Sequence, residues 1–407
     1  MADVRDNDPS SPAEDPSSSL HAASPEEIRA GEVTAAHLDT TRRILGTERA
    51  DLQVACEVRL GDLPAGWPWA ILCGLEEVLT LLEGRDVEAW AVPEGSVIYP
   101  EEPVLQIAGV YGEFVSLETA VVGMLAQPTG VATAAARLRL IAGGRPVYPL
   151  DLRTLHPAVV PVVERAAYVG GCDTVATPLG AELTGTDPMR LAGPELSLIL
   201  GEPDAWASFD ASVGETVPRV VIVGTLEDER TTAVAAAQAL GDHLAAVCIQ
   251  APAADPTRLI HLSREVRWEL DSRGRSDVRI IVSGDLDEST VPALARHVDG
   301  FGMGRAITAA PGADFVFEVV EVDGEARSRR GALSGRKTLW RCEACGNRGI
   351  APARVEHEPC PRCEGRLQGL LAPRLTWGAR DDRPVEAAAI RARALKEAAE
   401  APPPFPR

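Results

Sequence analysis

Four cysteines near the C-terminus have the spacing that most clearly indicates a defined chemistry. They form two Cys-x-x-Cys pairs, Cys342 with Cys345 and Cys360 with Cys363, and each pair lies in a short turn. Two such turns bring four thiolates to a tetrahedral zinc ion and leave no open position for water. We therefore expect a structural zinc site. Two unrelated redox pairs, or an iron ion at the same four sulfur atoms, are the alternatives.

An acidic group in the middle of the chain is a weaker candidate. Asp285, Asp287 and Glu288 follow an apolar stretch closely, so their carboxylates could reach a metal ion or a ribose hydroxyl. Acid-rich turns are more often simply solvated. The sequence leaves both interpretations open.

The elements that must position such residues follow a β-α rhythm. We expect strands at Val147–Leu152, Thr174–Thr177, Arg219–Val223, Ala245–Gln250, Val278–Val282 and Gly300–Met303. The stretches between them suit helices, for example Thr232–Leu244 and Arg258–Leu270. Repeated β-α units predict parallel strands, in an α/β barrel or an open sheet. In either form, ligands bind at the carboxyl ends of the strands.

The rest of the chain divides by composition. Mixed helix and strand signals precede the β-α region, with helices expected at Ile71–Leu82 and Glu118–Leu125. New strand signals follow the β-α region. We expect a disordered tail at 1–24, an α+β N-terminal module at 25–130, the α/β barrel at 131–310, return strands to the N-terminal module at 311–337, a zinc ribbon at 338–372 and a helical, Pro-rich tail at 373–407.

The composition of the chain limits the classes of partner that it can bind. The 407 residues are 45% hydrophobic, which is enough for a sizeable core, and their net charge is −20. A nucleic-acid surface needs clustered cations, so this charge disfavours nucleic-acid binding. No apolar run is long enough for a membrane span, and the N-terminus has no apolar signal core. The other four cysteines are scattered, which fits a reducing cytoplasm.

Several segments, taken in order, resemble the nicotinate phosphoribosyltransferase family, in the microbial branch that ends in a zinc ribbon. They are 93–109, Arg153–Pro157 with Ala167–Gly171, 282–288, 298–304 and Arg329–Lys337. The resemblance covers about residues 34 to 372. It implies a type II phosphoribosyltransferase-like α/β barrel with an α+β N-terminal module. It also implies a homodimer, in which one subunit's N-terminal module closes the barrel of its neighbour.

The resemblance also implies a reaction. The nitrogen of nicotinate attacks C1 of phosphoribosyl pyrophosphate, and pyrophosphate leaves, usually with Mg²⁺. Arg153 and His156 match the family's arginine–histidine–proline segment. The phosphate-binding positions that the family implies are Ser283, Gly284, Gly302, Gly304 and Arg305. Glycines there would let backbone amides approach a phosphate, although tight turns also use them.

Several catalytic positions of the family are replaced. Glu195 stands where the family couples ATP hydrolysis through a phosphorylated histidine, and Cys248–Pro252 replaces an Arg-Leu-Asp-Thr-Pro strand end. The fixed charge of Glu195 could imitate the phosphohistidine in an ATP-independent enzyme. Alternatively, Pro194 and Glu195 form an ordinary helix start.

Two functions therefore compete at this stage. One is a nicotinate phosphoribosyltransferase-like enzyme of NAD biosynthesis that transfers phosphoribosyl from phosphoribosyl pyrophosphate to a pyridine carboxylate, without conventional ATP coupling. The other is a non-catalytic homologue that binds a phosphorylated ligand or a partner protein.

Overall fold

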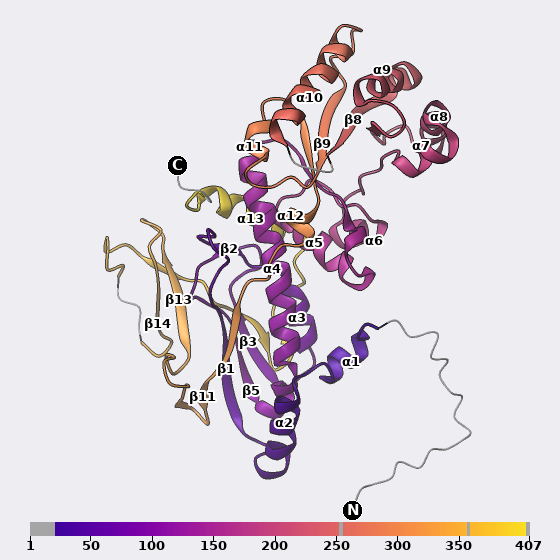
Figure 1. Cartoon of the computed structure of the whole chain (residues 1–407). Helices are drawn as coiled ribbons and strands as arrows, with labels where there is room; N and C mark the ends of the chain where they lie inside the picture. The colour runs from indigo at the N-terminus through magenta and orange to yellow at the C-terminus, as the bar shows by residue number, and fades with distance from the viewer. Residues whose placement is uncertain (1–20, 252–254, 356–358, 404–407) are drawn as a thin grey trace, which may run out of the picture.

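The computed structural model describes residues 21–251, 255–355 and 359–403 (Figure 1). The expected disordered tail therefore lies outside the described residues up to residue 20. In Figure 1 the barrel lies at the top, the large N-terminal sheet lies below it, and the ribbon stands beside that sheet.

The N-terminal lobe is built on an antiparallel sheet of seven strands within the described chain, in the order β12-β11-β1-β5-β3-β16-β17. Their bounds are β1 Gln53–Leu60, β3 Val87–Ala91, β5 Pro103–Val110, β11 Phe315–Val322, β12 Glu325–Ala326, β16 Ala372–Thr376 and β17 Ala379–Arg380. The pairing of β11 with β1 returns the chain to this sheet after the barrel. β16 pairs with β3, so the segment after residue 372 contributes strands as well as a helix.

Helices and a two-stranded sheet of β2 and β4 complete this lobe. The described elements are α1 Pro25–Ala30, α2 Ala36–Glu48, α3 Leu75–Leu82, β2 Ala70–Ile71 and β4 Val97–Ile98. The helix α3 begins later than residue 71, where the sequence places its start, because Ala70 and Ile71 pair with β4 as a strand. Both residues are fully buried, which explains why their apolar character resembled a helix face.

One long helix, α4 (Glu118–Ile141), joins the two lobes. The sequence predicts only its first turns, Glu118–Leu125, because the following residues show no polar face. Thr129 to Leu138 are buried without interruption, and a helix that is buried on all sides loses the amphipathic period. The expected boundary between residues 130 and 131 therefore falls inside a continuous helix.

The barrel contains a parallel sheet in the order β6-β10-β9-β8-β7. Its strands are β6 Val147–Pro149, β7 Arg219–Val223, β8 Leu244–Ala251, β9 Arg279–Gly284 and β10 Gly300–Met303. The expected strand Thr174–Thr177 is reduced to a single bridge, Val175 to Pro188.

Two further contacts close the ring. Ala192 bridges Val221 of β7 in parallel, and the backbone N–H of Asp173 donates to the carbonyl of Val147 in β6, at 2.8 Å. The segments 173–175 and 188–192 thus connect the two edges of the sheet. The expected α/β barrel is confirmed by this closed arrangement.

The two faces of the barrel strands have different surroundings. One face packs against the helices in the main core, for example through Val221, Val247 and Val282. The other face lines the barrel interior with Val220, Ile222, Ala246, Cys248 and Ile281, against which Tyr148, Met189 and Leu191 pack.

The described barrel helices are α5 Val160–Gly170, α6 Pro178–Thr184, α7 Pro194–Leu200, α8 Glu202–Ser212, α9 Glu229–Leu240, α10 Pro256–Asp271, α11 Val291–Leu294 and α12 Arg305–Thr308.

The ribbon consists of β13 (Lys337–Cys342), β14 (Arg348–Pro352) and β15 (Leu367–Gly369), in the order β14-β13-β15. The last helix, α13 (Ala387–Glu400), follows the ribbon in the chain and packs on α5 and α4.

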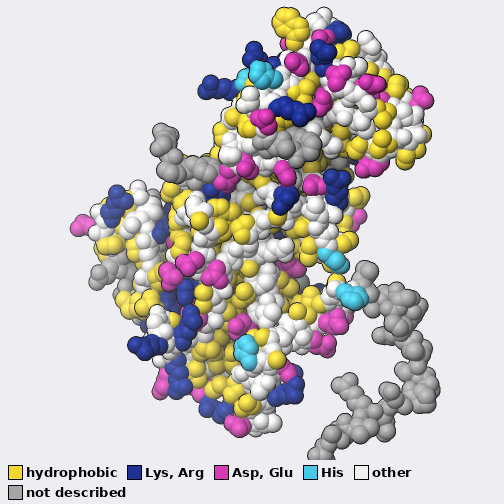
Figure 2. Space-filling model, viewed as in Figure 1, with side chains coloured by type: hydrophobic (Ala, Val, Ile, Leu, Met, Phe, Trp, Pro, Cys, Tyr) yellow, Lys and Arg dark blue, Asp and Glu magenta, His cyan; other side chains and the backbone are white. Residues whose placement is uncertain are grey.

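Of the described helices, none combines the length and apolar character needed to cross a membrane. Figure 2 shows acidic and basic side chains interspersed on the face in view, with no broad basic patch.

Candidate functional site

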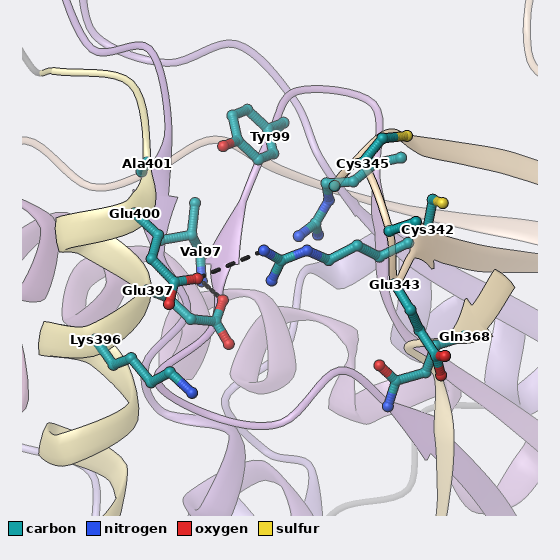
Figure 3. A pocket seen from close by; sticks show the side chains of 14 residues that line it. Val97, Tyr99, Cys342, Glu343, Cys345, Gln368, Lys396, Glu397, Glu400 and Ala401 are labelled. Carbon is teal, nitrogen blue, oxygen red and sulfur yellow. Dashed lines mark hydrogen bonds and ion pairs between the residues drawn. The ribbon is translucent and has the colours of Figure 1, made fainter. Parts of the chain in front are cut away.

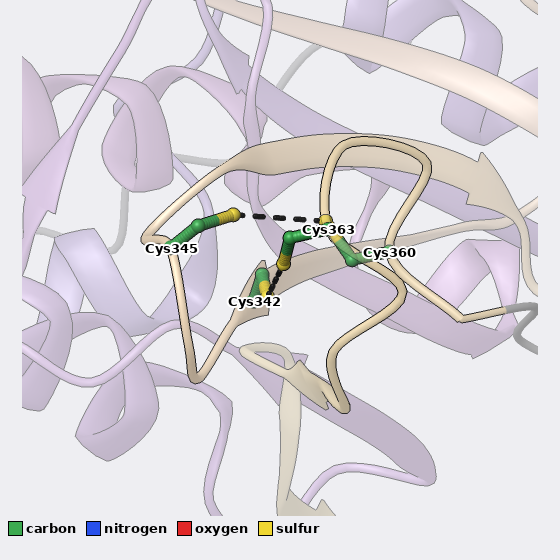
Figure 4. Close-up of side chains that lie close together, drawn as sticks. All are labelled: Cys342, Cys345, Cys360 and Cys363. Atoms are coloured by element: carbon green, nitrogen blue, oxygen red, sulfur yellow. Dashed lines mark hydrogen bonds between the residues drawn. The ribbon is translucent and has the colours of Figure 1, made fainter.

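The four cysteines converge on one point of the ribbon (Figure 4). Their Sγ atoms all lie within 4.8 Å of one another. The shortest pairs join opposite turns, Cys342 to Cys363 at 3.5 Å and Cys345 to Cys360 at 3.7 Å. Sulfur atoms about 2.3 Å from a tetrahedral zinc ion are about 3.8 Å apart, so one four-sulfur centre fits these spacings better than two separate pairs. The described residues hold no other group of three or more His, Cys, Asp or Glu side chains placed for a metal ion.

The backbone of the two turns explains why the sulfur atoms converge. The N–H of Gly346 donates to the carbonyl of Cys342, and the N–H of Glu364 donates to that of Cys360, so the two turns repeat one geometry. A Cβ on Gly365 would lie 3.1 Å from the Sγ of Cys342, so a larger residue there would crowd the sulfurs. Burial opposes the thiolate, but hydrogen bonds from backbone amides lower the pKa of Cys360 to about 6. A thiolate is the form that binds a metal.

Buried polar contacts fix the ribbon to the N-terminal lobe. Arg348 donates to both carboxylate oxygens of Glu102 at 2.7 Å each, and Glu102 is 8% exposed. Lys337 donates to Glu57 of β1 at 2.8 Å, and both side chains are buried. Removing one partner of such a pair is costly because the other charge stays buried. The ribbon is therefore held in a fixed place beside the sheet.

A polar cavity of about 720 Å³ separates the turn that carries Cys342 and Cys345 from α13 (Figure 3). Arg341 crosses it to Glu400 at 3.5 Å, and both side chains are well exposed. The cavity carries as many acids as bases, with Glu343, Glu397 and Glu400 facing Arg341, Arg348 and Lys396. This balance favours no particular ligand charge.

The barrel rim gathers the other expected residues at the ends of three adjacent strands. Gly302 of β10 lies opposite Ser283 of β9 on one side and Tyr148 of β6 on the other. The neighbouring pair is Met303 with Gly284. The ends of β6, β10 and β9 are therefore side by side, and the residues that follow them share one edge of the barrel.

The two glycines of β10 have different surroundings. A Cβ on Gly302 would lie 2.5 Å from Cδ1 of Leu150 and 2.6 Å from Cβ of Ser283, so packing inside the barrel already requires glycine there. A Cβ on Gly304 would meet only atoms at 3.3 Å or more, the nearest being the carbonyl oxygen of Gly284. Gly304 is thus the better probe of a phosphate cradle. Ser283 is buried and accepts a hydrogen bond from the Cys248 thiol at 3.3 Å.

Arg153 and His156 lie on the loop that follows β6. The Nε of Arg153 donates to Oδ1 of Asp151 at 2.8 Å, and the Arg153 side chain is 81% exposed. Nδ1 of His156 accepts from the backbone N–H of Ala158, which caps the next turn. Both side chains lie on the surface at the rim. Sequence reasoning passed over Asp151, although an acid directly after an apolar strand was a usable signal.

Glu195 occupies the first turn of α7, directly after Pro194. The helix start that the sequence offered as the alternative is therefore present. Glu195 is exposed, and its side chain folds back so far that a Cβ on Gly193 would lie 2.8 Å from its Oε2. Arg305 is likewise exposed, at the start of α12.

The acidic group after β9 is divided among different roles. Glu288 forms two hydrogen bonds, at 2.6 and 2.8 Å, with the buried guanidinium of Arg137 in α4. Asp287 accepts from the backbone N–H groups of Ser289 and Thr290, and these bonds lower its pKa although burial opposes them. Asp285 is exposed. These acids therefore do not form a dedicated magnesium site.

Comparison with known proteins agrees with this geometry. The family described as quinolinate phosphoribosyl transferase matches through its N-terminal domain at residues 39–129 and its C-terminal domain at residues 131–318. The chain belongs to the quinolinate and nicotinate phosphoribosyltransferase family. The expected membership and fold class are thus confirmed.

Individual members of the family show how far the likeness extends. The crystal structure of a nicotinate-nucleotide pyrophosphorylase from Pyrococcus furiosus has a TM-score of 0.88 and 40% identity, covering 94% of this chain and 98% of that one. A nicotinate phosphoribosyltransferase of Mycobacterium tuberculosis is 33% identical over 276 residues, or 64% of this chain. The chain spans 60% of the length of that mycobacterial relative. Human nicotinic acid phosphoribosyltransferase shares the fold, with a TM-score of 0.73 and 19% identity.

Proposed function

We propose that this family member is a phosphoribosyltransferase of NAD biosynthesis that joins the phosphoribosyl group of phosphoribosyl pyrophosphate to the ring nitrogen of a pyridine carboxylate. The observation that carries the proposal is the meeting of three strand ends, β6, β10 and β9, at one edge of the barrel. Backbone amides beside glycines suit phosphate oxygens, and arginines at the same edge suit pyrophosphate. The names of the relatives add the substrate class.

The expected residues at and after the three strand ends have separate roles in this proposal. Ser283, Gly284 and Gly304 supply the cradle of the 5′-phosphate, while Gly302 allows the strands to pack behind it. Arg153 and Arg305 bring positive charge to the rim, where pyrophosphate leaves. His156 shapes the loop that carries Arg153. Because charge develops on the leaving pyrophosphate, fixed cations there stabilise the transition state more than the ground state.

Two metals enter the proposal differently. Zinc is the ion we propose for Cys342, Cys345, Cys360 and Cys363, where four thiolates close the shell and hold the ribbon together. Magnesium would accompany pyrophosphate as its counter-ion, since the acids after β9 are committed to Arg137 and to a turn.

A homodimer is part of the proposal. Large apolar side chains are exposed on helices beside the barrel rim, with Leu198 65% and Ile199 77% exposed on α7 and Leu179 50% exposed on α6. An exposed apolar group of this kind favours contact with another protein surface. Ile199→Glu should shift the chain toward a monomer in sedimentation while circular dichroism shows the secondary structure of the wild type. A dimer that persists would exclude this face.

The direct test of transfer is an assay with phosphoribosyl pyrophosphate, Mg²⁺ and nicotinate, run with and without ATP. We expect mononucleotide in both reactions, because Glu195 cannot carry a phosphoryl group as histidine does. Product that requires ATP would refute the ATP-independent form.

A second candidate, a non-catalytic homologue that binds a phosphorylated ligand or a partner protein, is favoured by one feature. In β8, Cys248 stands where the family resemblance implies an arginine, and its buried thiol only donates a hydrogen bond to Ser283. Tight binding of phosphoribosyl pyrophosphate without any mononucleotide would support this candidate and refute the enzyme.

A further inference from the structure

Asp151 has an unusual backbone at the barrel rim. Its φ is +63° and its ψ is +37°, in the left-handed region that L-residues other than Asn and Asp seldom adopt. Five described residues other than glycine have a positive φ, and Asp151 is the one of these that follows a barrel strand. Strained conformations of this kind persist where the surroundings impose them, and they concentrate at functional sites.

The usual reason for an aspartate at such a turn does not apply. Asp151 precedes the short 3₁₀ turn Leu152–Thr154, but its side chain makes no capping hydrogen bond to that turn. Its Oδ1 instead accepts from Nε of Arg153 at 2.8 Å. The carboxylate is thus committed to the arginine and not to the local backbone.

This contact leaves the outer part of the guanidinium available. In the described chain, no hydrogen bond or ion pair engages the two terminal nitrogens of Arg153, whose side chain is 81% exposed. Those nitrogens form the planar fork that matches two oxygens of a phosphate. An arginine anchored through Nε therefore presents this fork in a restricted set of directions.

The pair also borders the glycine loops. A Cβ on Gly304 would lie 3.4 Å from Cβ of Asp151 and 3.6 Å from its Oδ2, and 3.3 Å from the carbonyl oxygen of Gly284. Asp151, Gly304 and Gly284 therefore meet where the ends of β6, β10 and β9 come together. A group held by Arg153 would lie next to anything bound at these loops.

We infer that Asp151 is a positioning residue of the phosphoribosyl pyrophosphate site. It anchors Arg153 through Nε and thereby aims the guanidinium fork at the pyrophosphate group, beside the phosphate loops. This inference rests on the proposed function, because the ligand is the one proposed there. It assigns to this chain a residue that acts only through its neighbour.

The test measures binding of phosphoribosyl pyrophosphate with Mg²⁺ by calorimetry in four proteins: the wild type, Asp151→Gly, Arg153→Ala and the double variant. Glycine accepts the same backbone angles, so Asp151→Gly removes the carboxylate without adding strain. We expect about tenfold weaker binding, the size of one charge-assisted contact. In the Arg153→Ala background the same change should have no further effect, because the carboxylate then has nothing to position.

Asp151→Asn is the matched control. Asparagine tolerates the left-handed backbone and keeps an accepting oxygen but lacks the charge, so its loss should lie between wild type and Asp151→Gly. It also replaces Asp151→Gly in the cycle should that variant unfold at lower temperature. Asp151→Gly binding that equals wild type, or a loss of equal size with and without Arg153, would overturn the inference.

Failure of the proposed function can be told apart from failure of the inference about Asp151. A wild type that binds phosphoribosyl pyrophosphate but forms no mononucleotide refutes transfer, while the binding cycle still decides the role of Asp151. A wild type that does not bind phosphoribosyl pyrophosphate refutes both.

Discussion

The ribbon and the barrel rim are two sites assembled in different ways. The ribbon takes its four sulfur atoms from two short turns with the same hydrogen-bond pattern, and the sulfurs lie within 4.8 Å of one another. The rim takes its residues from loops after three separate strands, and its arginines are exposed on the surface. A site built from a local repeat is complete within its own segment. A site built from strand ends depends on the whole barrel for its geometry.

The largest expected effect comes from removing one cysteine sulfur from the ribbon. Cys342→Ser should abolish the metal binding proposed for the four cysteines and unfold the ribbon, because metal binding supplies roughly 10 kcal/mol or more in comparable small zinc domains. Metal content and hydrogen exchange of β13 measure the effect, and the barrel should keep its protection. Glu343→Gln, in the same turn, is the control and should keep the metal. A ribbon that stays protected without metal would show that the sheet contacts alone hold it.

The second test separates structural acids from ligands at the rim. Glu288→Gln replaces the carboxylate that pairs with the buried guanidinium of Arg137, which is 2% exposed, by a neutral amide. We expect a loss of about 3 kcal/mol in the free energy of unfolding in urea. Asp285 is exposed, so Asp285→Asn should change the free energy of unfolding by less than about 0.5 kcal/mol. Equal effects would contradict the division of roles among these acids.

The third test compares the two glycines of β10. Gly302→Ala should cost about 1–3 kcal/mol of stability, because its Cβ would lie 2.5 Å from Leu150. Gly304→Ala should cost less stability than Gly302→Ala, because its Cβ meets no atom closer than 3.3 Å, and should weaken binding of phosphoribosyl pyrophosphate in calorimetry. Should Gly304→Ala bind as wild type does, the cradle must lie elsewhere.

The smallest expected effect belongs to Glu195. Glu195→Gln removes a charge near the positive end of the α7 dipole, which is worth about 0.5 kcal/mol. Thermal unfolding measures this loss. Binding of phosphoribosyl pyrophosphate should be unchanged if Glu195 only begins the helix, and a marked loss of mononucleotide formation would instead assign it a catalytic role.

Sequence reasoning reached the ribbon and the barrel strands because their signals are local. The cysteine spacing gives the ligand set directly, and apolar stretches such as Arg219–Val223 coincide with the observed β7. It missed the length of α4, since a helix buried on all sides has no polar period. It also missed the partnership of Glu288 with Arg137, whose positions are 151 residues apart in the chain.

The rim shows the same limit more sharply. Gly302 and Gly304 look equivalent in the sequence, yet only the strand register shows that Leu150 and Ser283 fill the space beside Gly302. The sequence could mark Asp151 as an acid after an apolar strand, but its role needs the backbone angles and the contact with Arg153. Chemistry that is assembled by tertiary contacts needs the fold before its residues can be assigned.

The helix α4 has a mechanical consequence for the whole molecule. Its 24 residues form a helix about 36 Å long that packs in both lobes. Gly130 lies against the chain at Pro311, where even a methyl group would collide with the carbonyl oxygen, and Gly170 of α5 lies equally close to Ala132. The two lobes are therefore held in close contact at residue 130, and we expect them to unfold as one cooperative unit.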